Sequence, residues 1–502
     1  MILMLKCLLA IPLVTGCLCL FIKKGRVAEL LNLLGASLCF TISILVLTDI
    51  TKGQPRCDFD GLIYVDALGG FFLFLTLLLS LAISIYSIGY MRQSLNKADL
   101  DRYLGRYYFY LNLFILTMIL AVTTGNLGIL WISIEATTLI STCLVGFYNE
   151  RTSLEAAWKY LIICAVGITF ALFGTTLFYY ASLNIPFELR NTLNWYEITR
   201  FADRLDPGLT KVAFIFILIG YGTKAGFAPM HTWLPDAHSQ APTPVSALLS
   251  GVLLKCALYG ILRFYIIAGK CLDAAYLNNL LLTFGIASLV IATFFILIQK
   301  DLKRLLAYSS LEHMGIIAAG IGFGGLLGVY GALFHVLNHA LVKSLMFFVS
   351  GNLSIRYHTK NMENIKGAVE TMPLTGTALL LGSFALAGVP PFNIFMSEIA
   401  ILTAGFSSGN ILASCIILVS LVIVFAGIVK HSTAMAFNSP PSGVGRGEID
   451  GWTVLACSIL LVPIVILGIY IPNFLDNIFN QSVCIITGEE TAWMKEGFSS
   501  MK

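Results

Sequence analysis

Long apolar runs alternate with short polar segments along most of the chain. A helix rises about 1.5 Å per residue, so about 20 apolar residues are enough to cross the hydrocarbon core of a bilayer. The pattern predicts an all-α, polytopic membrane protein. Fourteen membrane helices are expected, at about 2–21, 28–47, 62–90, 107–123, 127–146, 156–183, 209–227, 245–268, 275–299, 305–321, 326–350, 374–404, 411–429 and 452–471.

Two of these predicted helices are interrupted by glycine or proline. The seventh contains Gly220, Gly222 and Gly226 around Lys224, and the twelfth breaks at 390–391 before it presents Glu398. Non-helical backbone at membrane depth is tolerated only where it is buried in protein or lines a wet cavity. A broken helix that carries a buried charge is typical of an ion path.

The two breaks also suggest an internal repeat. Glu135 and His313 lie in the fifth and tenth helices, at nearly the same offset that separates Lys224 from Glu398. Two tandem five-helix units would give these offsets, and an odd number of helices inverts the second unit. We therefore predict helices 1–3 in 1–106, a first repeat in 107–268, a second repeat in 275–437, and helix 14 with a tail in 438–502.

Composition and charge agree with a membrane protein. Charged residues make up 12% of the chain, against about 25% in soluble domains, and the net charge is only +4. Alternate loops are rich in Lys and Arg, which predicts that both termini lie on the outer side. The outer loop 184–211 is an exception, because Arg190 and other cations there are balanced by acids such as Glu188. The first helix is expected to be a retained anchor, since its cations follow the apolar run.

Cofactor motifs are not found in the sequence. The twelve cysteines are scattered and no CxxC occurs, so zinc or iron–sulfur ligation is not expected. Neither a phosphate-binding Walker loop nor a glycine turn placed for a dinucleotide is present. We predict a chain without cofactor or metal, which binds no nucleic acid.

Three charged residues lie in the middle of predicted helices of the first repeat: Glu135, Lys224 and Lys255. A charge at this depth costs at least about 2.5 kcal/mol on an insertion scale, so these residues are expected to serve a function. A lysine that loses its counter-charge in a dry site releases its proton more readily, and this property makes a switch. The alternatives are a protonated, hydrogen-bonded Glu135 and a lysine that reaches toward the helix end.

A second set of titratable residues follows in the other half of the chain. His335, His339 and Lys343 are spaced four residues apart and share one face over about 12 Å. Histidine titrates near neutral pH and can relay protons, with His313 as a branch and Glu398 as the last acceptor. The alternatives are a zinc-binding HxxxH pair, which lacks a third ligand, and core histidines hydrogen-bonded to backbone.

Other polar residues lie closer to predicted helix ends. Caps or solvated faces are the better interpretation for Asp66, Glu150, Glu155 and Glu312. The loop after the seventh helix contains three further polar residues. A gating or access role there is as plausible as a loop held by its own hydrogen bonds, and the residues concerned are His231, Asp236 and His238.

The segment PMHTWLPDAHSQAPTPVSALLSGVLLK resembles the signature of the antiporter-like subunits of complex I and its relatives, the Mrp-type antiporters and membrane-bound nickel–iron hydrogenases. Similar segments cover nearly the whole chain, among them DALGGFFLF, IYSIGYMR, KRLLAYSSLEHMG and PPFNIFMSE. The strings EATTL and SLEAAWKYLIIC favour the hydrogenase-4 component F branch, which includes formate hydrogenlyase.

The resemblance implies a function and specific residues. Glu135 and Lys224 match the family's first charged pair, Lys255 its central lysine, and Glu398 a position held by Lys or Glu. The chain would conduct protons in a prokaryotic cytoplasmic membrane, beside other membrane subunits and a soluble iron–sulfur or nickel–iron arm. Two alternatives stay open: a sodium/proton antiporter subunit of the Mrp type without redox partners, and a scaffold whose charges form static pairs.

Overall fold

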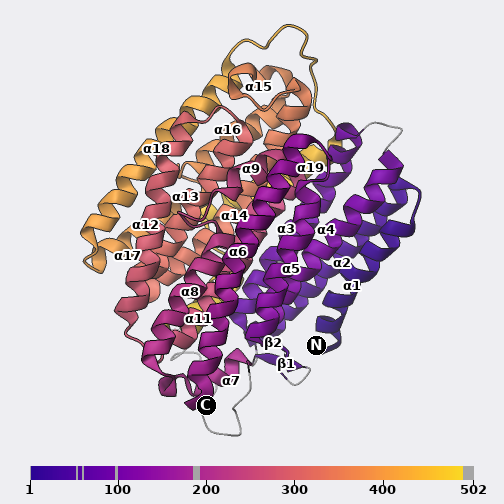
Figure 1. Ribbon diagram of the computed structural model, residues 1–502. Helices are drawn as coiled ribbons and strands as arrows, with labels where there is room; N and C mark the ends of the chain where they lie inside the picture. Colours follow the sequence, from indigo (N-terminus) through magenta and orange to yellow (C-terminus); the bar gives the residue numbers. More distant parts are fainter. Residues whose placement is uncertain (1, 53–54, 59–60, 96–99, 185–192, 490–502) are drawn as a thin grey trace.

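The apolar runs fold into long helices that lie side by side in one bundle in the computed structural model (Figure 1). The structure describes residues 2–52, 55–58, 61–95, 100–184 and 193–489. Glu188 and Arg190 of the predicted outer loop, and the tail beyond 489, lie outside the described residues.

The first half of the chain contains the following elements: α1 Ile2–Phe21, α2 Gly25–Lys52, β1 Arg56–Asp58, β2 Ile63–Val65, α3 Ala67–Ser94, α4 Leu100–Thr123, α5 Leu127–Val145, α6 Arg151–Ala181, η1 Ser182–Asn184, α7 Trp195–Arg200, η3 Ala202–Arg204, α8 Pro207–Ala225, α9 Trp233–Gln240, α10 Thr243–Leu248, η4 Leu249–Leu253 and α11 Leu254–Ala268.

The second half contains these elements: α12 Ala274–Ile298, α13 Leu302–Phe323, α14 Gly325–Tyr357, η5 Met362–Asn364, α15 Ala368–Thr371, α16 Pro373–Leu386, α17 Asn393–Ser407, α18 Ile411–Phe437, α19 Gly451–Ile469 and α20 Asn473–Thr487. The bundle is therefore almost entirely helical, which confirms the predicted fold class.

All fourteen predicted membrane helices have a counterpart. In the described residues, twelve helices or continuous helical runs are long and apolar enough to cross a membrane. The other two predictions correspond to α13 and to the pair α16 and α17. The predicted start of the third helix at residue 62 was wrong, because residues 63–65 pair with 56–58 in a short antiparallel hairpin. Asp66 then caps α3 by accepting a hydrogen bond from the Gly69 N–H.

Both predicted breaks are present. α8 ends at Ala225, and Gly226 follows it with a φ of +82°, a left-handed conformation that favours glycine. The chain then turns into α9, so Asp236 and His238 lie on a short helix and not in the expected loop. α16 and α17 are separated by residues 387–392. A π-helical turn, η4, interrupts the eighth predicted helix, at 245–268, and this feature was not predicted.

α14 is the central helix of the bundle. It packs against α13, α17, α16, α19, α20 and α3, and its residues 331–353 are all buried. Its polar residues therefore face protein and not lipid. The peripheral helices α1, α2 and α18 instead expose large apolar side chains, as expected for a surface in contact with acyl chains.

The two ends of the bundle differ in their loops. The hairpin β1–β2 and α7 lie at one end, and α15 lies at the opposite end (Figure 1). The first two elements belong to loops that we predicted on the outer side, and α15 to a loop predicted inside. The two loops predicted on one side thus lie at one end of the bundle, and the loop predicted on the other side lies at the opposite end. Which end faces the outside stays a prediction.

A buried ion pair joins α3 to α11 near the hairpin. Nη1 and Nη2 of Arg263 donate to the two carboxylate oxygens of Asp66 at 2.8 and 2.5 Å. The guanidinium carbon lies 3.9 Å from the ring centroid of Trp195 in α7 and 4.6 Å from that of Tyr259. Arg263 has no exposed surface. Its planar group thus ties three elements together by hydrogen bonds and stacking.

Asp66→Asn should destabilise the protein strongly. Asn still caps α3, but it leaves the buried guanidinium without a counter-charge, which typically costs about 3–5 kcal/mol. Thermal unfolding of the purified chain in detergent measures this. Asp49→Asn is the matched control, because its pair with Arg56 is more than 40% exposed on both sides and should contribute less than about 1 kcal/mol. Equal losses in the two variants would contradict a special role of the buried pair.

Candidate ion path

The first predicted pair is linked through a hydroxyl group. Nζ of Lys224 donates to Oγ1 of Thr138 at 2.8 Å and to the Tyr160 hydroxyl at 2.5 Å. Thr138 in turn donates to Oε2 of Glu135 at 3.3 Å, one turn earlier on α5. The Tyr160 hydroxyl also pairs with Oγ of Ser141 at 2.7 Å. The structure thus brings Glu135 and Lys224 together through the bridging hydroxyl group of Thr138, without a direct contact between them.

Thr138, Tyr160 and Ser141 were missed by the sequence analysis. Hydroxyl residues in a membrane helix commonly bond to their own backbone, so their types alone gave no signal. Thr138 lies on α5 and Tyr160 on α6, and only the packing of these two helices brings the side chains together. The helical spacing of Thr138 to Glu135 was the one clue available, because residues three apart share a face.

Lys255 is held by the irregular turn that precedes it. Nζ of Lys255 donates to the carbonyl of Ser250 at 2.5 Å, a group within the π-helical segment η4. The same ammonium lies 2.6 Å from Nδ1 of His339 on α14. Helical irregularities of this kind are frequent at functional sites. Lys255 and His339 therefore form a direct hydrogen-bonded contact between the two predicted repeats.

The three histidines continue from this contact as a cluster. The ring of His313 lies between the other two, with centroid distances of 4.9 Å to His339 and 5.1 Å to His335. Nδ1 of His313 is 3.0 Å from Nε2 of His335, and Nδ1 of His335 is 3.0 Å from Oγ of Ser397. His313 was predicted as a branch, and its geometry instead makes it the link between His339 and His335.

Lys343 lies beside this cluster and not within its hydrogen-bonded chain. Its Nζ donates to the backbone carbonyl of Leu306 on α13 at 2.8 Å. The ammonium is completely buried. A backbone carbonyl carries only a partial charge, so the ammonium also needs an acidic group within electrostatic range.

Glu398 lies at the start of α17, directly after Ser397. Its carboxylate packs on the backbone at Gly388, where a Cβ atom would come within 2.2 Å of Oε2. Gly388 has a φ of +65°, so both its backbone conformation and the available space require glycine. Oε1 of Glu398 is buried and has no hydrogen-bond partner within the described part of the chain. Glu398 is the last member of what we call the buried row, and its carboxyl group can still accept a bond. The buried row consists of Glu135, Lys224, Lys255, His339, His313, His335, Lys343 and Glu398.

The family model described as "NADH:quinone oxidoreductase/Mrp antiporter, TM" matches residues 124–424, which include every residue of the row. The chain belongs to this family. It is 38% identical over 420 residues to a hydrogenase-4 component F homolog of Methylacidiphilum infernorum (isolate V4), covering 84% of this chain and 87% of that protein.

Two solved structures share the fold of this antiporter-family chain. One belongs to the membrane-bound sulfane sulfur reductase, an archaeal respiratory membrane complex, with a TM-score of 0.85, 24% identity and coverage of 96% and 97% of the two chains. The other belongs to the Mrp complex from Dietzia sp. DQ12-45-1b, with a TM-score of 0.84, 19% identity and coverage of 97% and 98%. Both are multisubunit membrane complexes.

The three residues with a possible gating role differ in their surroundings. Asp236 is ion-paired with Arg304 at 2.6 Å and with Lys159 at 3.3 Å, which fixes α9 to α13 and α6. His231 is largely buried, with its ring centroid 6.4 Å from that of Tyr308. His238 is fully buried and stacks on Phe347 at 5.2 Å. For Asp236 the contacts therefore favour the static alternative.

The acids near predicted helix ends divide into two groups. Asp66 and Glu150 cap helices, and Glu155 is 59% exposed beside Lys159, so for these three the caps and solvated faces are confirmed. For Glu312 the interpretation was wrong. It lies in the middle of α13, which packs against α12, α14 and α17, and its side chain is 1% exposed.

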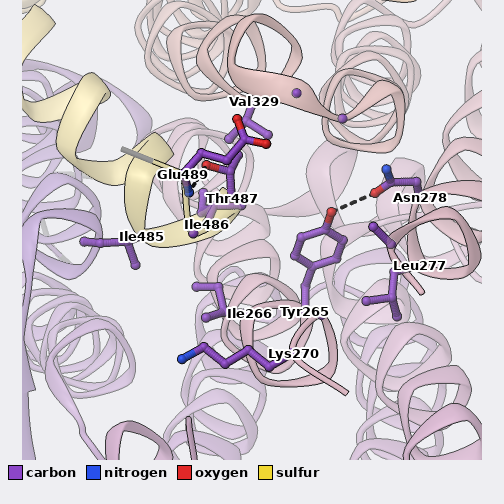
Figure 2. Close-up of a pocket in the computed structure, with 15 residues that line it drawn as sticks. Tyr265, Ile266, Lys270, Leu277, Asn278, Val329, Ile485, Ile486, Thr487 and Glu489 are labelled. Carbon is purple, nitrogen blue, oxygen red and sulfur yellow. Dashed lines mark hydrogen bonds between the residues drawn. The ribbon is translucent and has the colours of Figure 1, made fainter. Parts of the chain in front are cut away.

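A separate cavity of about 190 Å³ lies where α11, α12, α14 and α20 meet (Figure 2). Tyr265 donates a hydrogen bond to Asn278 at 2.7 Å on its wall, and Lys270 and Glu489 also line it. No residue of the buried row lines this cavity. It is therefore not part of the candidate path.

Gly388→Ala should disturb the end of the row. A left-handed φ costs a non-glycine residue about 1–2 kcal/mol, and the added methyl group also displaces the Glu398 carboxylate. Gly409→Ala is the matched control, because Gly409 has a φ of +78° and a methyl group there would meet no atom of the described residues within 4 Å, apart from its chain neighbours. We expect Gly388→Ala to lower the thermal midpoint more than Gly409→Ala does. Equal midpoints would show that the carboxylate is free to move away.

Proposed function

We propose that this chain is the proton-conducting subunit of a membrane-bound redox complex. It would move protons through the buried row and contain no redox group of its own. The observation that carries the proposal is the contact of Lys255 with His339, continued through His313 and His335 to Ser397. Titratable groups buried at this depth are expensive, and a connected series of them gives a proton a route across an apolar interior.

The hydrogen bonds assign the protons in part of this series. Oγ of Ser397 donates to the Ile394 carbonyl, so it accepts from Nδ1–H of His335. Nε2 of His335 is then an acceptor, and Nδ1 of His313 donates to it. In this assignment Nε2 of His313 carries no proton.

At the other end of the series, the ammonium of Lys255 donates to Nδ1 of His339, which leaves a proton on Nε2 of His339. This nitrogen and Nε2 of His313 are both buried without a partner within the described residues. Their rings are 4.9 Å apart between centroids. One bridging water molecule would join this donor to this acceptor and complete a relay from Lys255 to Ser397.

The redox partner is proposed from the relatives. The relative at 38% identity is named as a hydrogenase-4 component F homolog. We therefore propose that a soluble arm with iron–sulfur and nickel–iron centres drives this subunit, through neighbouring membrane subunits.

The partial exposure of Glu135 supports the proposal that a neighbouring membrane subunit contacts this chain. It is only partly buried, on a face of α5 where Ile132 and Leu139 are each more than half exposed. A carboxyl group at this depth is unfavourable against lipid, so a neighbour that covers this face would stabilise it.

Location and orientation follow from the loop charges. We propose the cytoplasmic membrane of a prokaryote, with both termini on the outer side, because the loops of the opposite end are richer in Lys and Arg. The proposal includes the two inverted five-helix repeats. Along the chain, Lys224 lies just before the first helix break, whereas Glu398 lies after the second.

An Mrp-type sodium/proton antiporter subunit is the second candidate function. The shared fold with the Mrp complex favours it. Membrane vesicles that contain the native complex separate the two functions. Redox-driven proton transfer without sodium supports the first, whereas sodium-dependent proton exchange without a redox substrate supports the second.

Lys224→Met and Lys255→Met should each abolish proton transfer in these vesicles. Methionine keeps an unbranched side chain but cannot carry a proton, and it also removes the contact with Tyr160 or His339. Redox-driven membrane potential is measured alongside assembly of the complex. A normal membrane potential in both variants would refute conduction through the row.

Glu135→Gln should slow proton transfer, whereas Glu135→Asp should retain part of it. Gln keeps the hydrogen bond to Thr138 but cannot stabilise the charged form of Lys224. The initial rate of redox-driven proton uptake measures this. Glu155→Gln, on the exposed face of α6, is the control and should behave as wild type. Equal rates for Glu135→Gln and the control would make Glu135 a structural residue.

A further inference from the structure

Glu312 is an acidic group in the interior that the path described so far does not use. Its side chain lies on α13, in the residue before His313, and is 1% exposed. Oε2 is buried and has no hydrogen-bond partner within the described residues. Burying a carboxyl group without full hydrogen bonding is costly, so its position requires a compensating interaction.

Lys343 provides that interaction from the facing helix. α13 packs against α14, and Nζ of Lys343 donates to Leu306, six residues before Glu312 on α13. This contact places the Lys343 ammonium on the buried α13 segment that also carries Glu312, where charges are weakly screened and the two groups interact. The two side chains do not form a direct ion pair in this structure. A shift of the ammonium by about 9 Å or less along α13 would bring them into contact.

Glu398 is the next acidic group. It is buried on α17, which packs against both α13 and α14, and it is within electrostatic range of Glu312. Lys343 and the two carboxyl groups therefore lie in one dry region, with His313 and His335 beside them and Lys255 within electrostatic range of Lys343. Two carboxylates close together in a dry region repel each other, so one of the two carboxyl groups favours its protonated form.

We propose that Glu312 is a proton-carrying partner of Lys343, which passes a proton from the lysine to Glu398. The proton leaves Nζ of Lys343 and joins the Glu312 carboxylate, then moves to the carboxylate of Glu398, while Lys343 is recharged from the histidine cluster. This inference rests on the proposed function. It gives the second half of the chain a glutamate–lysine pair of its own.

In both glutamate–lysine pairs, neutral groups hold the lysine in this structure. In the first, Lys224 is held by Tyr160 and Thr138 and reaches Glu135 only through the hydroxyl of Thr138. In the second, Lys343 is held by a backbone carbonyl. Both lysines are thus bound by neutral groups near their acidic partner. This arrangement lets the ammonium exchange its partner when a proton arrives, which a tight ion pair would oppose.

The test uses the native complex in vesicles with the variants Glu312→Gln, Lys343→Met and the combination of both. Redox-driven proton transfer and the thermal midpoint of the purified complex are measured for each. We expect Glu312→Gln to slow proton transfer about tenfold or more, and Glu312→Asp to retain part of the rate. We also expect Glu312→Gln to lower the thermal midpoint, because the Lys343 charge is left unpaired.

The double variant separates a proton carrier from a static pair. Removing both charges should restore the thermal midpoint, as replacement of a whole buried pair often does, but not proton transfer. Recovery of both would overturn the inference, because Glu312 would then be needed only to neutralise Lys343. If the double variant recovers neither, the two residues are not a pair, and the inference also fails.

Lys224→Met distinguishes this inference from the proposed function. Loss of transfer in Lys224→Met together with wild-type transfer in Glu312→Gln would refute the role of Glu312 and leave the proposed function standing. Wild-type transfer in Lys224→Met and Lys255→Met would refute the proposed function and the inference with it. Glu155→Gln is the matched control and should retain wild-type transfer and midpoint.

Discussion

The cost of a charge in a dry, apolar interior governs the arrangement of this protein. Each buried charged side chain in the row needs a partner, and the bundle supplies partners of graded strength. Arg263 receives a full carboxylate in two-point contact, and it is enclosed by aromatic rings. Lys224, Lys255 and Lys343 receive hydroxyl groups, an imidazole and backbone carbonyls instead. The strong partner fixes structure, and the weaker ones leave the lysines free to change state.

Two of the buried charged groups lie against irregular backbone, where carbonyl groups or space are left open that a regular helix would use. The π-helical turn before Lys255 presents the Ser250 carbonyl, and the break before α17 lets the Glu398 carboxylate pack against Gly388. At these two places, an irregular backbone segment therefore accommodates a buried charged side chain. The polar residues of α14 also face protein and not lipid.

Much of this could be predicted from the sequence, for identifiable reasons. The helices follow from apolar run length, and the two breaks follow from glycine and proline near charged residues. The common face of His335 and His339 follows from helical spacing. The links that join helices could not be predicted, because they depend on packing. The contacts of Lys224 with Thr138 and Tyr160, and of His335 with Ser397, are examples. Glu312 was misinterpreted although the predicted helix 305–321 already placed it in the interior of that helix, because its burial depends on how α13 packs against its neighbours.

The position of His313 shows how packing changes an expected role. Spacing along α14 places His335 one turn from His339, which predicts a direct relay between them. In the structure, the ring of His313 lies between the two, so the route leaves α14, crosses to α13 and returns. In the proposed relay, a proton would pass within one residue of Glu312 before it reaches Ser397. Because α13 carries Glu312, His313 and the Leu306 carbonyl that holds Lys343, a movement of α13 relative to α14 would alter the histidine contacts and the Lys343 contact together.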